Sequence, residues 1–131
     1  MVDITGVAHF SIPVSDPERS IRFYTDVVGC KLLRTQPDKS MTFLDAGGVC
    51  VLLIKTPYSP GRAISTEVHH AFMLPKGGYQ GGVAHLRSKG VQIELEEDRQ
   101  GGTINGPRAY FYDPDGTILE FIDRTSYLHQ K

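Results

Sequence analysis

Residues 7–29 read VAHFSIPVSDPERSIRFYTDVVG, and this unit decides the fold because its pattern returns later in the chain. The apolar run at its start predicts a strand, and Asp16 followed by Pro17 is typical of a helix start. Apolar residues then recur at helical spacing from Pro17 to Val28, and Gly29 suits the left-handed position that ends a helix. The stretch therefore predicts a β-strand followed by an α-helix.

Three strands are expected after this helix, so the first half has the order βαβββ. They cover residues 31–35, 41–46 and 49–55. Gly47-Gly48 predicts a tight hairpin turn between the last two. Residues 56–66 contain two prolines and a glycine, which indicates a linker.

The second half repeats the same order of elements. Its expected elements are a strand over 68–74, a helix over 80–89 closed by Gly90, and strands over 91–96, 109–112 and 117–122. Asp113-Pro114-Asp115-Gly116 predicts a turn before the last strand. We expect an α+β fold in which two paired βαβββ modules, about 1–58 and 67–131, form a cupped mixed sheet around a cleft within one domain over residues 1–131.

Two histidines fall at equivalent positions of the two modules. His9 and His69 each lie in the first strand of a module, two residues before Ser11 and Ala71 respectively. Since strand side chains alternate between faces, we expect both imidazoles to point into the cleft and His70 to point away.

Glu120 lies in the last predicted strand between large apolar residues, where a carboxylate is costly to bury unless it is paired or bound to a cation. Taken singly, each histidine could be a hydrogen-bonded strand residue and Glu120 a salt-bridged edge residue. Taken together, His9, His69 and Glu120 suit one divalent ion, Fe(II), Mn(II), Zn(II), Ni(II) or Co(II), with positions left open for substrate or water.

Several motifs together resemble the glyoxalase, bleomycin-resistance and extradiol-dioxygenase superfamily, also called vicinal oxygen chelate proteins. They are His9 followed by residues 16–24, Val27-Val28-Gly29, His69-His70-Ala71-Phe72, and Asp113-Pro114-Asp115-Gly116 with Glu120 four residues after the glycine. The resemblance implies paired βαβββ modules, metal ligands at His9, His69 and Glu120, often a homodimer, and a metal that holds two neighbouring oxygen atoms of a substrate.

Departures from the family pattern bear on the reaction. Glyoxalase I-like proteins place a fourth ligand in the last strand of the first module, where Leu53 is the expected match here, and leucine cannot bind a metal. Extradiol dioxygenases use three such ligands and a tyrosine that Tyr110 matches, so Tyr110 is the predicted catalytic residue. Their acid–base histidine has no counterpart in residues 51–68, and Tyr110 could also be a packing residue.

Three functions stay open. The first is a metal-dependent enzyme, of extradiol-dioxygenase type or a glyoxalase-type lyase or isomerase. The alternative is a bleomycin-resistance-type protein that binds a drug or metabolite, although such proteins generally lack the metal triad. A fosfomycin-resistance thiol transferase is ranked below these, because its Ser-rich cation-binding loop is not evident in residues 98–106. In this chain the same segment could form a flexible lid beside the cleft.

Composition and charge limit the classes of binding partner that we expect. A net charge of −1 gives no footprint for nucleic acid or an anionic membrane, so a small-molecule substrate is expected. The start lacks a signal-peptide pattern and no window approaches a membrane span, which predicts a cytoplasmic protein. Cys30 and Cys50 are interpreted as buried reduced thiols. His85 and His129 are interpreted as solvated residues. Arg108 could bind a substrate carboxylate near the cleft, but a surface ion pair is the preferred interpretation.

Overall fold

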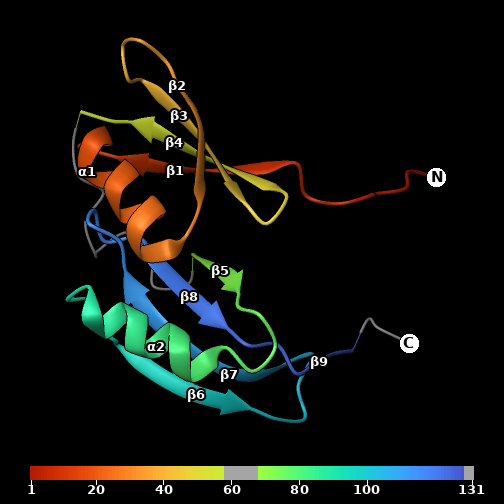
Figure 1. Ribbon diagram of the computed structural model, residues 1–131. Helices are drawn as coiled ribbons and strands as arrows, with labels where there is room; N and C mark the ends of the chain where they lie inside the picture. The colour runs from red at the N-terminus through yellow and green to blue at the C-terminus, as the bar shows by residue number, and fades with distance from the viewer. Residues whose placement is uncertain (58–67, 129–131) are drawn as a thin grey trace. The chain divides into compact units, whose positions relative to one another are not determined.

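The computed structural model describes residues 1–57 and 68–128, which fall into two compact units, Met1–Pro60 and Gly61–Lys131 (Figure 1). Unit 1 contains β1 (His9–Val14), α1 (Pro17–Arg22), the π-helix η1 (Phe23–Val28), β2 (Lys31–Thr35), β3 (Met41–Ala46) and β4 (Val49–Lys55). Unit 2 contains β5 (His69–Met73), α2 (Tyr79–Ser88), β6 (Leu95–Arg99), β7 (Ile104–Tyr112), β8 (Ile118–Ile122) and β9 (Ser126–Tyr127).

The sheet of unit 1 is mixed, with the strand order β1-β4-β3-β2. Strand β1 pairs parallel with β4, and the other two pairings are antiparallel. One face carries the buried side chains, because successive residues of a strand point to opposite sides. These are Ile12, Val14, Leu44, Val51 and Leu53, with Tyr24 and Val27 buried on the helical segment. This apolar face is the core of the unit.

The predicted helix over 17–28 is confirmed, but its second half is wound as a π-helix. The Asp16 carboxylate accepts a hydrogen bond from the Arg19 N–H at 3.2 Å, so the predicted cap is present. Gly29 has φ +94° and ends the helix in the left-handed region. The Cys30 N–H then bonds the Tyr24 carbonyl at 2.8 Å, which closes the last wide turn.

Unit 2 repeats the arrangement with the strand order β5-β8-β7-β6, and the short β9 pairs with β7. Strand β5 pairs parallel with β8. Helix α2 packs against β7 and β8 through Val83 and Leu86, on the face that carries Phe111 and Phe121. The two aromatic rings meet edge to face with centroids 5.0 Å apart. The expected α+β class and mixed sheets are confirmed.

The turn between β7 and β8 is the one expected from the sequence. Asp113 Oδ1 accepts hydrogen bonds from the N–H groups of Asp115 (2.9 Å) and Thr117 (2.8 Å), and Gly116 adopts φ +89°. Since Asp113 is itself buried, its side chain satisfies amides that would otherwise lack partners. The turn fixes where β8 begins, and therefore where Glu120 lies.

Three expectations for unit 2 were wrong. The strand expected over 91–96 is displaced to Leu95–Arg99, since β6 is an edge strand rich in charge and the apolar residues before it form no ladder. The strand expected over 109–112 begins at Ile104, because Gly106 and Pro107 are accommodated opposite β6. Strand β9 was not expected at all.

The remaining strands and α2 agree with expectation to within one or two residues. The greater part of the expected linker, residues 58–66, lies outside the described residues, as does His129. None of the helices in the described ranges is long and apolar enough to cross a membrane.

Candidate metal centre

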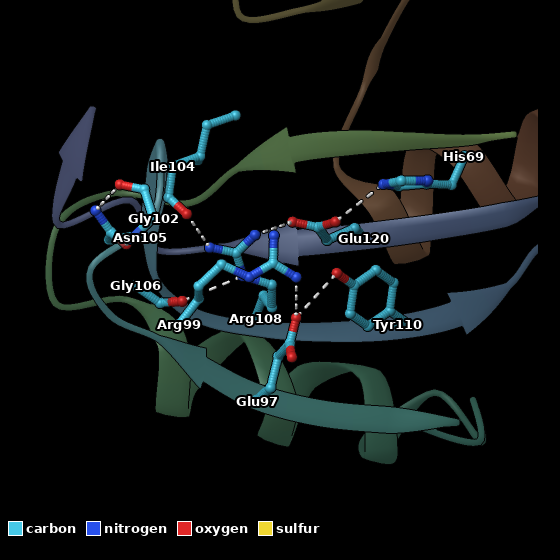
Figure 2. Close-up of polar contacts among 10 residues, drawn as sticks. All are labelled: His69, Glu97, Arg99, Gly102, Ile104, Asn105, Gly106, Arg108, Tyr110 and Glu120. Atoms are coloured by element: carbon cyan, nitrogen blue, oxygen red, sulfur yellow. Dashed lines mark hydrogen bonds and ion pairs between the residues drawn. The ribbon is translucent and has the colours of Figure 1, made fainter. Parts of the chain in front are cut away.

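Four neighbouring strands of unit 2 carry polar side chains on the face opposite α2 (Figure 2). The register places Tyr110 of β7 opposite Glu120 of β8, and Glu97 of β6 opposite Arg108 of β7. On the other side of β8, Ala71 is paired with Glu120, so His69 lies two residues away on the same face. The sheet thus aligns an imidazole, a carboxylate, a guanidinium and a phenol.

His69 and Glu120 form the centre of this row. The His69 Nε2 atom lies 3.3 Å from Glu120 Oε1, within reach of a direct polar contact. The Glu120 side chain is only 4% exposed, whereas that of His69 is 40% exposed. The pair therefore presents one buried carboxylate and one imidazole that solvent reaches.

Arg108 lies on the other side of Glu120 (Figure 2). Its NH1 atom is 3.7 Å from Glu120 Oε2, and its side chain is 4% exposed. Two further guanidinium nitrogens donate to backbone carbonyls, NH2 to Ile104 at 2.7 Å and Nε to Gly106 at 3.3 Å. The surface ion pair expected for Arg108 was wrong, because the pair is buried. Arg108 shares its strand parity with Tyr110, and this signal could have assigned it to the site.

Tyr110 lies between the two carboxylates of the row. Its ring packs edge-on against His69, with centroids 5.9 Å apart, and its hydroxyl donates to Glu97 Oε1 at 3.4 Å. Burial raises the pKa of Tyr110, and the negative charges of Glu120 and Glu97 raise it further. The phenol consequently stays protonated at neutral pH and can act as a hydrogen-bond donor.

Glu97 and Arg99 complete the row, and sequence reasoning assigned neither of them to the site. Arg99 NH2 lies 2.7 Å from Glu97 Oε1, the same oxygen that the Tyr110 hydroxyl contacts. The sequence leaves residues 98–106 open as a flexible lid beside the cleft. The Asn105 side chain stabilises this loop, because it accepts a hydrogen bond from the Gly102 N–H at 2.7 Å and donates one to the Gly102 carbonyl at 2.9 Å.

A cavity of about 240 Å³ adjoins Tyr110 within unit 2. Its lining is apolar and aromatic apart from one carboxylate, and consists of Glu94, Leu95, Tyr110, Phe111, Tyr112 and Ile118. This volume lies somewhat below the range of about 300–1,000 Å³ that is usual for ligand pockets, so the space can accept only a small apolar or aromatic group. The phenol of Tyr110 therefore belongs both to the polar row and to the cavity.

The register also defines the counterparts of these residues in unit 1. Ser11 pairs with Leu52 as Ala71 pairs with Glu120, so Leu52 is the counterpart of Glu120. The sequence-based match to Leu53 was wrong, because Leu53 pairs with Ile12 on the buried face. Both residues are leucine, so the position offers no metal ligand in either case.

His9 occupies in β1 the place that His69 occupies in β5, because each is the first residue of a strand that pairs parallel with β4 or β8 respectively. Among residues 1–57 and 68–128, no three His, Cys, Asp or Glu side chains gather in one cluster that could hold a metal ion. His9 belongs to unit 1, and it remains a predicted ligand.

The other predicted residues lie as follows. His70 pairs with Leu119 on the α2 side of the sheet, as expected, and burial lowers its pKa, with a further contribution from His69. His85 is exposed on α2. Cys30 is buried, and burial raises its pKa to about 11, whereas Cys50 is only half-buried.

The donor atoms of unit 2 fit a divalent metal. A buried carboxylate and an imidazole nitrogen 3.3 Å apart are ligands that first-row divalent ions accept. Glu120 also has a second polar partner in Arg108, as ligating carboxylates usually have. The pair therefore supplies part of a ligand set and leaves the remaining positions to other donors.

Comparison with known proteins supports the same family. The family model of the Glyoxalase/Bleomycin resistance protein/Dioxygenase superfamily matches residues 6–121. Similar curated proteins include a metallothiol transferase FosB of Lysinibacillus sphaericus, which is 30% identical over 90% of this chain and 82% of that protein. A lactoylglutathione lyase of Haemophilus influenzae is 27% identical over 92% of this chain and 93% of that protein. A catechol-2,3-dioxygenase of Bacillus subtilis is 26% identical over 92% of this chain and 42% of the dioxygenase.

A fosfomycin resistance protein of Listeria monocytogenes, FosX, solved in complex with Mn(II) and 1S,2S-dihydroxypropylphosphonic acid, has the same fold. Its TM-score is 0.75 at 20% identity, over 94% of this chain and 93% of that one. The fold, the paired strand register and the match over residues 6–121 agree with one another. This chain belongs to the Glyoxalase/Bleomycin resistance protein/Dioxygenase superfamily.

Proposed function

We propose that the chain is a metal-dependent enzyme acting on a small molecule with two neighbouring oxygen atoms. The observation that carries the proposal is the 3.3 Å approach of His69 Nε2 to the buried Glu120 Oε1. His9 is proposed as the third protein ligand, because it is the counterpart of His69 in the other unit. Leu52 at the counterpart of Glu120 leaves the proposed set at three protein ligands.

The metal, when bound, would supply positive charge that holds substrate oxygens and stabilises negative charge on them. The chain's own residues supply the other parts. Tyr110 carries a hydroxyl that remains a donor at neutral pH, and the cavity beside it accepts an apolar or aromatic body. These residues would orient a substrate and limit the access of water.

Extradiol ring cleavage is our first candidate reaction. It is supported by a three-ligand set, by Tyr110 at the position of the family's tyrosine, and by a cavity whose only charged lining residue is Glu94. The similarity to a catechol-2,3-dioxygenase agrees with it. A glyoxalase-type reaction is less well supported, because leucine stands at the fourth-ligand position.

Opening of an epoxide by a thiol or by water is the second candidate. The similarity to FosB, and the fold shared with a FosX that was solved with Mn(II) and a dihydroxypropylphosphonic acid, favour it. A phosphonate would have to be accommodated beside Glu94, which bears charge of the same sign, whereas Glu97 is paired with Arg99.

Elemental analysis of protein purified without chelator tests the proposal. We expect one metal per chain. Protein reconstituted anaerobically with Fe(II) is then assayed for oxygen uptake with catechols, and protein loaded with Mn(II) for the opening of fosfomycin by a thiol or by water. Oxygen uptake would support the first candidate and epoxide opening the second. Absence of stoichiometric metal after both reconstitutions would contradict the proposal and favour a binding protein.

The homodimer suggested by the family resemblance is part of the proposal. Light scattering on the purified protein measures it, with a mass of twice 14.5 kDa as the expected result.

A further inference from the structure

We infer that Arg108 is a positioning residue for Glu120: it holds Oε2 so that Glu120 turns the single oxygen Oε1 toward His69. The inference rests on the proposed function, since it concerns how Glu120 would meet a metal. It is based on the different partners of the two Glu120 carboxylate oxygens: His69 Nε2 lies 3.3 Å from Oε1, and Arg108 NH1 lies 3.7 Å from Oε2.

The guanidinium is held in place by the backbone. Arg108 donates to the Ile104 carbonyl at 2.7 Å and to the Gly106 carbonyl at 3.3 Å, both at the start of its own strand. Three of its nitrogens therefore face separate partners, two backbone carbonyls and the Glu120 carboxylate, and a lysine ammonium lacks the rigid fork that makes this possible. The position of NH1 beside Glu120 follows from this anchoring.

The two anchoring carbonyls are themselves fixed. Gly106 adopts φ +121°, and a Cβ at this position would lie 2.1 Å from the Asp123 carbonyl oxygen. The Asp123 N–H donates to the Pro107 carbonyl at 3.0 Å, and the Thr125 N–H donates to the Asn105 carbonyl at 2.9 Å. Because the neighbouring chain is bonded on both sides of Gly106, the acceptors of Arg108 have little freedom to move.

The contact is better suited to orienting Glu120 than to binding it tightly. At 3.7 Å the NH1 to Oε2 separation exceeds that of a direct hydrogen bond, and the interaction is charge attraction across a buried space. A metal bound at Oε1 would not have to break it. Glu120 can therefore keep Arg108 as a partner and gain another.

Unit 1 provides an independent comparison. Arg108 pairs with Ile122 in β7 and β8, and the corresponding pair in β3 and β4 is Met41 with Ile54. At the counterpart of Glu120 stands Leu52. Unit 2 thus has both Glu120 and Arg108, and unit 1 has apolar residues at both matching positions. This is expected if the role of Arg108 is to position Glu120.

The test measures the Kd for Mn(II) by calorimetry and by the electron paramagnetic resonance signal of free Mn(II), on Arg108→Lys and Arg108→Gln. Circular dichroism and Tm are recorded on the metal-free proteins. We expect Kd to rise by roughly 10-fold in Arg108→Lys and by up to about 100-fold in Arg108→Gln, the range found when partners of metal ligands are lost. If Arg108→Gln does not fold, Arg108→Lys, which keeps the charge and the stem, decides the question.

Arg87→Gln is the matched control. Arg87 lies on α2 with its NH2 atom 3.5 Å from Glu96 Oε2, and both side chains are exposed. Arg87→Gln removes one positive charge, as Arg108→Gln does. We expect its Kd to equal that of the unmodified protein.

Glu120→Gln separates the inference from the proposed function. Undiminished Mn(II) binding in Glu120→Gln would contradict Glu120 as a ligand, and with it the proposed function. Loss of Mn(II) in Glu120→Gln, with Kd unchanged in both Arg108 variants, would overturn only the role of Arg108. A lower Kd in Arg108→Gln would also overturn it, since Arg108 would then merely repel the metal.

Discussion

Tyr110 lies directly opposite Glu120 in the ladder between β7 and β8, and both side chains share a face with His69. The Tyr110 ring contacts His69 edge-on with centroids 5.9 Å apart, and it also lines the cavity. The phenol is therefore the one group of the row that adjoins both the proposed ligand pair, His69 and Glu120, and the cavity.

Tyr110→Phe should lower kcat while leaving metal binding intact. The change removes a hydroxyl but keeps the ring against His69, so one hydrogen bond to the reacting molecule is lost. We expect a decrease in kcat of about 10² with whichever substrate the activity screen identifies. Steady-state kinetics and metal content measure the two effects. An unchanged kcat would assign Tyr110 to packing alone.

His69→Ala should abolish stoichiometric metal binding without unfolding the protein. The imidazole is 40% exposed and lies on an edge strand of the unit 2 sheet, so little core packing is lost. His70→Ala is the control, because that side chain lies on the opposite face. Metal content and circular dichroism are compared for the two variants. Equal metal content in both would contradict the ligand assignment.

Leu95→Trp should raise KM by roughly 10-fold without changing metal content. Leu95 lines the cavity and is 55% exposed, so an indole can replace it and occupy part of the space. Leu33→Trp is a suitable control, since Leu33 is a similarly exposed strand residue of unit 1. A KM that moves equally in both variants would argue against the cavity as the substrate site.

Cys30 should make the protein less stable as the pH rises from 9 to 11. Burial raises the pKa of its thiol from 9.0 to about 11. In this window the unfolded chain loses the proton first and so binds fewer protons than the folded chain, which lowers the free energy of unfolding. We expect a loss of about 1–2 kcal/mol relative to Cys30→Ala, allowing for partial solvent screening. Urea unfolding at both pH values measures it, and parallel curves for the two proteins would refute it.

The sequence predicted the fold well where local chemistry decides the structure. Asp16, Gly29 and the Asp113 turn act through neighbouring backbone groups, and each is where it was expected. The strand β6 was displaced because its position depends on pairing with β7, and its own residues Leu95–Arg99 are mostly charged. Non-local pairing of this kind leaves no periodic signal in an edge strand.

Part of the candidate site could also be predicted. The alternation of strand side chains placed His69 on one face and His70 on the other, and the register confirms this. The same rule was not applied to Arg108, because the strand was expected only over 109–112 and Arg108 lay just before it, where a surface ion pair was preferred to a substrate-binding role. The observed strand begins at Ile104 and places Arg108 on the face of Tyr110. The burial of Arg108 depends on the carbonyls of Ile104 and Gly106, whose positions no local pattern reveals.

The two sheets share the same strand order but carry different side chains at matching register positions. Where unit 2 has Arg108, Tyr110 and Glu120, the matching register positions of unit 1 hold Met41, Phe43 and Leu52. If the chain had two identical halves, each half would offer the same ligands for a metal ion. At these register positions only unit 2 carries an acid and a cation, which makes the expected stoichiometry one ion per chain and leaves unit 1 to contribute His9 alone.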